Sequence, residues 1–435
     1  MDLAVKNGHV YSEGRFMRKN LYIKNGRIEK ITDSDIEAEE TYDASGDLVL
    51  PGLIDPHVHF SLDLGDHVSV DDFDAGTRAA AYGGVTTVID FLDPVARAED
   101  IPSAFEARKA LAEKSHIDYR FHATIKNPGD DIAAFMDAMK RFGLNSLKFF
   151  TTYSDSGRRT YDDDILRILK TAKEKDILPL AHIEDDAQIT LDPAFTHEDL
   201  PRSRPTSCER DEALKLAGYV EKTGGRLYMV HLSSGDTLEA LQAAYPSLLN
   251  SRFFIETCPQ YVTFTSDVLS GEEGHLYTFA PPLRSAPERK RLVERFDAID
   301  SIGTDHCAFM RREKEVSTLS DMPLGIGGVE HSFNVMYRRF GMQAVERMSA
   351  APARLFGMYP RKGTIKEGSD ADLFIYALEE GTIEENHARS DYSVYHGLER
   401  SGYVRSTLSR GAFVMKDRVF KGGNGQWIEG AMHNG

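Results

Sequence analysis

Four histidines, one lysine and one aspartate occur at the ends of short apolar segments of the chain. His57 and His59 lie two residues apart at the end of LVLPGLIDPHVHF, so on an extended chain their side chains share one face. The other four are Lys148 in SLKFF, His182 in LPLAHIE, His231 in RLYMVHLSS and Asp305 in DSIGTDHCA. Imidazole nitrogens and a carboxylate oxygen suit zinc and similar divalent ions. The pattern therefore predicts a metal site.

Such a site requires a fold that brings the ends of separate strands together. Eight short apolar segments alternate with amphipathic helical patterns, which is typical of a parallel α/β fold. We predict a (β/α)8 TIM-type barrel over residues 51–355, with its active site at the C-terminal ends of the strands. A single histidine at a strand end is usually a packed or surface residue. Four histidines and an aspartate at strand ends of one barrel are not explained by packing.

The two ends of the chain predict a second, smaller domain. Residues 1–50 contain short strand patterns separated by turns, with Asn-Gly at hairpin-like positions. Similar patterns return near the C-terminus in GTIKEGSDADLFIYA and YVRSTLSRGAFVMKDRVFKGG. We predict that residues 1–50 and 356–435 together form a β-sandwich. Its expected task is to pack on the barrel and support assembly, without supplying catalytic groups.

Lys148 is the unusual member of the predicted site. An isolated ammonium group is costly to bury, so this lysine must be neutralised, paired or chemically altered. One interpretation is a structural salt bridge. The other is reaction with carbon dioxide, which gives a carbamate whose oxygens can bridge two metals. His306, next to Asp305, points to the opposite face of its strand and is interpreted as structural.

Composition and charge exclude several classes of partner. The 435 residues include 52 Lys and Arg against 69 Asp and Glu, a formal charge of -17 that disfavours nucleic acid and anionic membranes. No segment approaches the ~20 apolar residues that span a bilayer, and the first residues lack a secretion-signal pattern, which favours the cytoplasm. The three cysteines form no CxxC pair, so neither a disulfide framework nor a cysteine zinc site is expected.

The order of motifs along nearly the whole chain resembles the amidohydrolase superfamily, and within it the cyclic amidohydrolases: dihydropyrimidinase, hydantoinase, allantoinase and dihydroorotase. The similar blocks are PGLIDPHVHF, GTRAAAYGGVTTVIDF, SLKFFTTY, MVHLSSG, ETCPQY, APPLR, GTDHCAF and LFGMYPRKGTIKEGSDADL. The resemblance implies two divalent metals, expected to be zinc. His57, His59 and Asp305 would hold the first, His182 and His231 the second, and carboxylated Lys148 would bridge them. It also implies a homodimer or homotetramer.

One segment and three single positions bear on the subgroup. Allantoinase and dihydroorotase typically place an arginine soon after His-x-His, whereas FSLDLGDHVSVDDF has none, which favours the hydantoinase and dihydropyrimidinase type. Tyr153 stands where those enzymes keep a tyrosine that hydrogen-bonds the reacting carbonyl; its alternative role is a pocket-wall aromatic. Ala280 and Leu324 replace the Ser and Asn usual in hydantoinases, at positions expected to contact the substrate through the main chain.

The predicted function is hydrolysis of a cyclic amide, a hydantoin or dihydropyrimidine ring, to a ureido acid. A hydroxide shared by the two metals would attack the ring carbonyl, Asp305 would transfer the proton, and Tyr153 would stabilise the carbonyl oxygen. One alternative is a dihydroorotase or allantoinase that recognises a carboxylate through Arg158 or Arg284. A non-catalytic dihydropyrimidinase-like scaffold is disfavoured, because every ligand position is filled.

Overall fold

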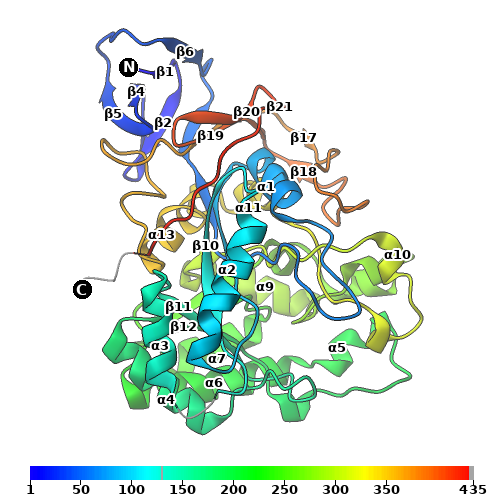
Figure 1. Ribbon diagram of the computed structural model, residues 1–435. Coiled ribbons are helices and arrows are strands. Elements are labelled where there is room, and N and C mark those ends of the chain that lie inside the picture. Colours follow the sequence, from blue (N-terminus) through cyan, green and yellow to red (C-terminus); the bar gives the residue numbers. More distant parts are fainter. Residues whose placement is uncertain (129–130, 431–435) are drawn as a thin grey trace.

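The computed structural model describes residues 1–128 and 131–430, which divide into two parts (Figure 1). A parallel barrel surrounded by helices occupies the lower part of the view, and two β-sheets lie above it on the side of the N-terminus. The predicted fold class, a TIM-type barrel with a smaller β-sandwich, is confirmed.

Eight consecutive strands form the barrel sheet, in the order in which they occur in the chain. They are β8 (Leu53–Asp55), β9 (Val85–Phe91), β10 (Asp118–Thr124), β11 (Ser146–Phe150), β12 (Leu178–His182), β13 (Leu227–Met229), β14 (Phe253–Thr257) and β15 (Ser301–Ile302). Beyond β8 and β15 the barrel closes through a parallel bridge between Val58 and His306. There the Asp305 N–H donates to the carbonyl oxygen of His57 at 2.9 Å. Closure therefore places the first and last predicted metal-binding segments side by side.

The apolar run LVLPGLIDPHVHF, predicted as one strand, forms two. β7 (Leu48–Pro51) pairs with a strand of the sandwich, whereas β8 begins the barrel. They meet at Gly52, where a Cβ atom would lie 2.2 Å from the Thr86 hydroxyl oxygen, so a side chain does not fit. Both strands are buried, so hydrophobicity alone gives no sign of the division.

The helices between the barrel strands present one apolar face to the sheet. In α4 (Asp162–Lys175), three aspartates in the first turn stabilise the helix, because their negative charges interact favourably with the positive end of the helix dipole. Ile165, Ile168 and Leu169 follow the helical spacing and are buried. The remaining helices are α1 (Phe73–Tyr82), α2 (Ile101–Ala112), α3 (Ile132–Arg141), α5 (Leu200–Ser203), α6 (Thr206–Thr223), α7 (Gly235–Ala244), α8 (Pro259–Thr263), α9 (Ala286–Glu294), α10 (Arg311–Lys314), α11 (Ser332–Phe340), α12 (Met342–Arg347) and α13 (Ala350–Leu355).

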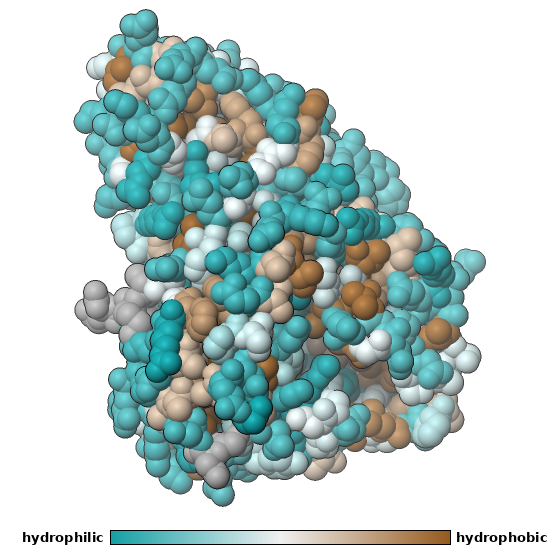
Figure 2. Space-filling model, viewed as in Figure 1, coloured by the Kyte–Doolittle hydropathy of each residue, from teal (hydrophilic) through white to brown (hydrophobic). Residues whose placement is uncertain are grey.

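The visible surface is mostly hydrophilic, with apolar residues in separate patches (Figure 2). This agrees with a charged fraction of 28%. Among the helices of the described residues, none has both the length and the apolar character that crossing a membrane requires.

The second part is built from both ends of the chain. One sheet has the order β5-β4-β1-β6 and the other β21-β20-β19-β16-β7-β2-β3. The strands not yet given are β1 (Leu3–Lys6), β2 (His9–Ser12), β3 (Arg15–Met17), β4 (Asn20–Lys24), β5 (Arg27–Thr32), β6 (Glu40–Asp43), β16 (Leu373–Ala377), β19 (Tyr403–Ser409), β20 (Ala412–Lys416) and β21 (Val419–Phe420), with β17 (Gly381–Thr382) and β18 (Glu399–Arg400) forming a separate pair. Val5, Ile23, Val49, Ile375 and Leu408 belong to one buried apolar cluster, so both chain ends contribute to the same core.

The described part of the C-terminal tail packs on the barrel. The N–H of Tyr119 donates to the carbonyl oxygen of Gln426 at 3.0 Å, and the N–H of Ile428 donates to that of Tyr119 at 3.0 Å. The Trp427 ring lies 5.1 Å from the Phe105 ring. The tail therefore extends from the sandwich to barrel strand β10; residues 431–435, which the predicted sandwich range also includes, lie outside the described residues.

A buried ion network joins the two parts. The Lys362 ammonium contacts the carboxylates of Asp118, Asp370 (3.1 Å) and Asp372 (2.6 Å), and all four side chains are at most 3% exposed. Asp118 begins barrel strand β10, whereas Asp370 and Asp372 immediately precede sandwich strand β16. Arg410 also contacts Asp118. These contacts neutralise a cluster of acidic groups between the barrel and the sandwich.

Replacing Lys362 with methionine is expected to lower the free energy of unfolding by about 3–5 kcal/mol, because it leaves buried carboxylates without their shared cation. Urea denaturation followed by circular dichroism measures the change. The matched control is Lys366→Met, whose half-exposed ammonium lies 3.4 Å from Glu13 and whose loss should cost less than about 1 kcal/mol. Equal stability of the two variants would contradict the importance of the network.

Candidate metal centre and active site

The predicted residues meet in one pocket at the C-terminal ends of the barrel strands. The pocket has a volume of about 150 Å³. Its lining includes His57, His59, Lys148, Tyr153, His182, His231, Ala280, Asp305 and Leu324, which is every site residue that the sequence predicted. A larger surface cleft of about 430 Å³, lined in part by Tyr82, Thr382 and Arg400, contains none of them.

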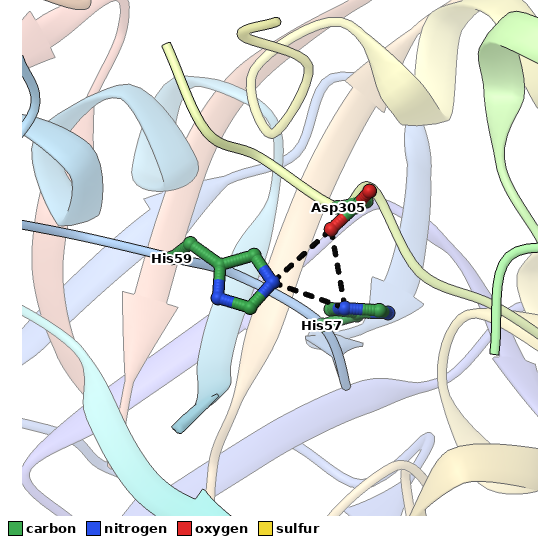
Figure 3. A group of neighbouring side chains, drawn as sticks. All are labelled: His57, His59 and Asp305. Atoms are coloured by element: carbon green, nitrogen blue, oxygen red, sulfur yellow. Dashed lines mark hydrogen bonds and ion pairs between the residues drawn. The ribbon is translucent and has the colours of Figure 1, made fainter. Parts of the chain in front are cut away.

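Three side chains converge on one point (Figure 3). His57 Nε2 lies 3.2 Å from His59 Nε2 and 3.1 Å from Asp305 Oδ1, and His59 Nε2 lies 3.2 Å from the same oxygen. Two imidazole nitrogens and a carboxylate oxygen at this spacing form a candidate ligand set for a divalent metal. Asp305 has φ of +53°, a backbone conformation that is uncommon outside glycine and that clusters at functional sites.

Glu256 orients this group, although the sequence analysis did not single it out. One of its carboxylate oxygens lies 2.8 Å from His57 Nδ1 and accepts the backbone N–H of His231 at 2.9 Å. The Tyr228 hydroxyl donates to the other oxygen at 2.7 Å. A proton held on Nδ1 leaves the lone pair of His57 Nε2 facing the pocket. An acidic residue within the apolar segment RFFIETCP is the sequence signal that could have identified Glu256.

His182 and His231 lie beside this triad. The His231 ring is 5.5 Å from the His57 ring and 4.6 Å from the His182 ring. His182 Nε2 lies 2.7 Å from a Glu184 oxygen, and Arg204 pairs with the same carboxylate. His231 Nδ1 is buried without a hydrogen-bond partner in the described structure. Across the described ranges, the pair belongs to no compact group of three ligand atoms like the triad.

The acid–base properties of these groups follow from their burial. Burial lowers the pKa of His57 and His231 well below the usual value, so both imidazoles are neutral at pH 7. Burial raises the pKa of Asp305, but His57 and His59 outweigh it and the pKa falls below its usual value. Similarly, Arg204 and His182 outweigh the burial of Glu184 and lower its pKa to about 2. Neutral imidazoles and an ionised aspartate are the forms that bind metal.

Lys148 lies inside the pocket with a 3% exposed side chain. Its ammonium is 5.2 Å from the centre of the Phe91 ring and 5.4 Å from that of the Phe150 ring. Within the described residues it makes no hydrogen bond or ion pair, so the structural salt bridge considered from the sequence is not formed. Burial lowers the pKa of Lys148 to about 8.

Tyr153 lies next to the second pair of histidines. Its ring centre is 5.2 Å from that of His182, and the Arg204 guanidinium lies 5.1 Å from the tyrosine ring centre. Burial raises the pKa of Tyr153, so its hydroxyl keeps a proton to donate at neutral pH. Ala280 and Leu324 line another part of the pocket wall.

Three further residues from the sequence analysis have clear positions. His306 accepts the Gly328 N–H at 3.0 Å through Nδ1, and its Nε2 lies 3.0 Å from Asp71, so it packs outside the pocket as predicted. Arg284 donates to Ser233 at 2.9 Å and to the Arg204 carbonyl oxygen at 2.6 Å. The Arg284 guanidinium is therefore held by groups of the protein, whereas Arg158 lines the pocket.

Comparison with known proteins agrees with this geometry. Residues 48–414 match the Amidohydrolase family. The chain is 35% identical to a D-phenylhydantoinase of Escherichia coli O1:K1 / APEC, over 98% of each chain. Among solved structures, D-hydantoinase from a Bacillus sp. AR9 has a TM-score of 0.94 at 30% identity over 100% of each chain. Dihydropyrimidinase from Brevibacillus agri NCHU1002 has a TM-score of 0.92 at 30% identity over 99% of each chain.

The chain therefore belongs to the amidohydrolase family, a family of metal-dependent hydrolases. Within it, the chain is a cyclic amidohydrolase of the hydantoinase and dihydropyrimidinase type, an enzyme that hydrolyses a cyclic amide. The predicted family and enzyme class are confirmed.

Proposed function

We propose that this enzyme opens hydantoin or dihydropyrimidine rings and releases a ureido acid, using two zinc ions held in the pocket. His57, His59 and Asp305 would hold the first ion, and His182 and His231 would hold the second. Carboxylated Lys148 would be a ligand of both. The observation that carries the proposal is the convergence of four histidines, Lys148 and Asp305 in one pocket of a cyclic amidohydrolase.

The side chains present fit two metals. The triad offers three donor atoms within 3.2 Å of one another, and Glu256 keeps the proton of His57 on the nitrogen that faces away from them. Ionised Glu184 holds a proton on His182 Nε2, so Nδ1 of that ring keeps a lone pair. The unpartnered Nδ1 of His231 is a buried polar atom adjacent to these ligands. Nitrogen and oxygen donors of this kind favour zinc.

Carboxylation explains the unpaired Lys148. A buried ammonium without a partner is costly, and the pKa of about 8 increases the fraction of neutral amine at pH 7. The neutral amine attacks carbon dioxide, an N–C bond forms, and one proton is released to give an anionic carbamate. This anion supplies oxygen atoms between the two groups of histidines and replaces the uncompensated positive charge.

Each residue of the pocket has its own proposed role in hydrolysis. Divalent metals held by these residues would supply Lewis-acid chemistry, making water a stronger nucleophile near neutral pH and polarising the ring carbonyl. Asp305 accepts the proton of the attacking water and passes it to the departing ring nitrogen as the C–N bond breaks. The Tyr153 hydroxyl donates to the carbonyl oxygen, which gains negative charge during attack. Main-chain groups at Ala280 and Leu324 hold the ring.

We also propose the domain bounds, the oligomeric state and the cellular location of the enzyme. Residues 1–50 and 356–435 form the sandwich, residues 51–355 form the barrel, and the enzyme is a cytoplasmic homodimer or homotetramer. The sandwich built from both chain ends supports the division. Light scattering of the purified protein measures the oligomeric state, and cell fractionation tests the location.

Elemental analysis and ring-opening assays on hydantoin, dihydrouracil, allantoin and dihydroorotate test the function. We expect nearly two zinc ions per chain and turnover of hydantoin or dihydrouracil. Activity confined to allantoin or dihydroorotate would favour the allantoinase or dihydroorotase alternative over the hydantoinase and dihydropyrimidinase type. A purified protein without metal that retains full activity would contradict the metal centre.

A further inference from the structure

Arg158 is a cationic side chain in the active-site pocket that hydrolysis itself does not use. It is partly buried and lines the same cavity as Tyr153 and the metal-binding triad. Much of the remaining lining is apolar: Leu62, Leu64, Phe91, Leu92, Pro94, Phe150, Phe279, Ala280 and Leu324. A guanidinium beside apolar walls favours a ligand group of opposite charge.

A compact turn brings this arginine to the pocket. Tyr153 and Gly157 both have positive φ, of +69° and +67°. The Arg158 N–H donates to the Tyr153 carbonyl oxygen at 3.1 Å, and the Ser156 hydroxyl donates to the same oxygen at 3.2 Å. The backbone of Arg158 is thereby tied to the residue proposed to contact the reacting carbonyl. Tyr153 and Arg158 line the same cavity.

Nothing in the described structure neutralises Arg158. It makes no hydrogen bond through its guanidinium and no ion pair with any described residue. Its neighbour Arg159 differs, since it pairs with Asp186 at 3.1 Å and lies over the Tyr161 ring at 5.0 Å. Arg204 is likewise held, by Glu184. Arg158 is therefore free to pair with a ligand.

One carboxylate other than Asp305 lines the pocket, that of Asp63. Asp63 is exposed, and its Oδ1 accepts the Gly65 N–H at 2.8 Å within its own loop. It makes no ion pair with Arg158 in the described structure. Outside the proposed metal ligands, the pocket lining is thus largely apolar, and Arg158 is its one cation without a hydrogen-bond or ion-pair partner among the described residues.

We propose that the substrate ring carries a carboxylate substituent, which Arg158 binds. The inference rests on the proposed ring-opening function and specifies its substrate class. A planar guanidinium binds a carboxylate through two parallel hydrogen bonds, which are stronger than bonds between neutral groups. An uncharged amide of the same shape offers one acceptor and no charge, so the pocket discriminates between the two.

Pairs of substrates that differ only in this group test the inference. Hydantoins with a carboxymethyl or carboxyethyl group are compared with their carbamoyl analogues, and dihydroorotate with its amide. We expect a carboxylate-to-amide ratio of kcat/KM of about 10 to 100 in at least one pair. The pair with the largest ratio identifies the distance between the ring and the carboxylate.

The variants assign this preference to Arg158. Arg158→Gln should bring the ratio to near one, and Arg158→Glu should bring it below one. The matched control is Arg159→Gln, which removes a neighbouring charge of the same kind outside the pocket and should keep the wild-type ratio. A wild-type ratio of one or less in every pair, or an unchanged ratio in Arg158→Gln, overturns the inference.

Binding provides a measurement independent of turnover. Calorimetry compares N-carbamoylaspartate and N-carbamoylglutamate, which are ring-opened products with the proposed carboxylate, with N-carbamoylasparagine and N-carbamoylglutamine. Tighter binding of either acid to the wild type, lost in Arg158→Gln, supports the inference; equal binding overturns it. Hydrolysis of unsubstituted hydantoin or dihydrouracil reports separately on the proposed function.

Discussion

Lys148→Ala is expected to lower kcat/KM by about three orders of magnitude and to reduce the metal content below two ions per chain. The lysine is 3% exposed and unpaired within the described residues, and its proposed carbamate supplies the bridging oxygen ligands. Without them, the histidines remain but the shared negative charge is lost. The expected loss follows from removing an electrostatic group that both orients and activates the nucleophile. Steady-state kinetics and elemental analysis measure the two effects.

Chemical rescue distinguishes a carbamate from a structural lysine. Truncation to alanine leaves space in the pocket for a small carboxylate, so added acetate or propionate should restore part of the activity and metal binding. Chloride at equal ionic strength should restore neither. Lys170→Ala, on the exposed face of α4, is the matched control and should retain wild-type activity. Full activity and two metals in Lys148→Ala would contradict the bridging role.

Tyr153→Phe is expected to lower kcat by about 100- to 1,000-fold with little change in KM. The hydroxyl is proposed to donate to an oxygen that becomes negative only as the carbonyl is attacked, so its loss affects the transition state more than substrate binding. Because burial raises the pKa of Tyr153, the donor is protonated throughout the neutral range. Steady-state kinetics on hydantoin or dihydrouracil measure the split between kcat and KM.

Metal content separates this role from damage to the site. Tyr153→Phe should keep nearly two metals, since the phenol is not among the proposed ligands. Tyr161→Phe is the matched control because Tyr161 is 52% exposed and lies outside the pocket lining. A wild-type kcat in Tyr153→Phe would contradict the proposed role of the hydroxyl. It would support the alternative considered from the sequence, in which Tyr153 is only a pocket-wall aromatic.

Much of the barrel was predictable because its signals are local. Each buried parallel strand reads as a short apolar run, and each covering helix repeats apolar residues at helical spacing, as in α4. The polar residues that follow these runs are conspicuous for the same reason. His57 and His59 could be assigned to one face from their spacing alone.

Other features depend on which segments become neighbours. Glu256 supports His57 across 199 positions of the chain, and Arg204 joins Glu184 from another segment. The division of one apolar run at Gly52 follows from the approach of Thr86, and the return of Trp427 to the barrel follows from packing on Phe105. Such contacts leave no periodic pattern in the chain.

The sequence by itself determined the type of fold, the residues available for a metal centre and the family, since residue type and spacing along each strand carry that information. Only the tertiary structure decided which arginine is available to a ligand. Arg158 and Arg284 look alike in the sequence. The guanidinium of Arg158 lines the pocket without a hydrogen-bond or ion-pair partner among the described residues, whereas that of Arg284 donates to Ser233 and to a carbonyl oxygen. Whether a charged side chain can bind a ligand depends on its neighbours in space, and tertiary packing determines those neighbours.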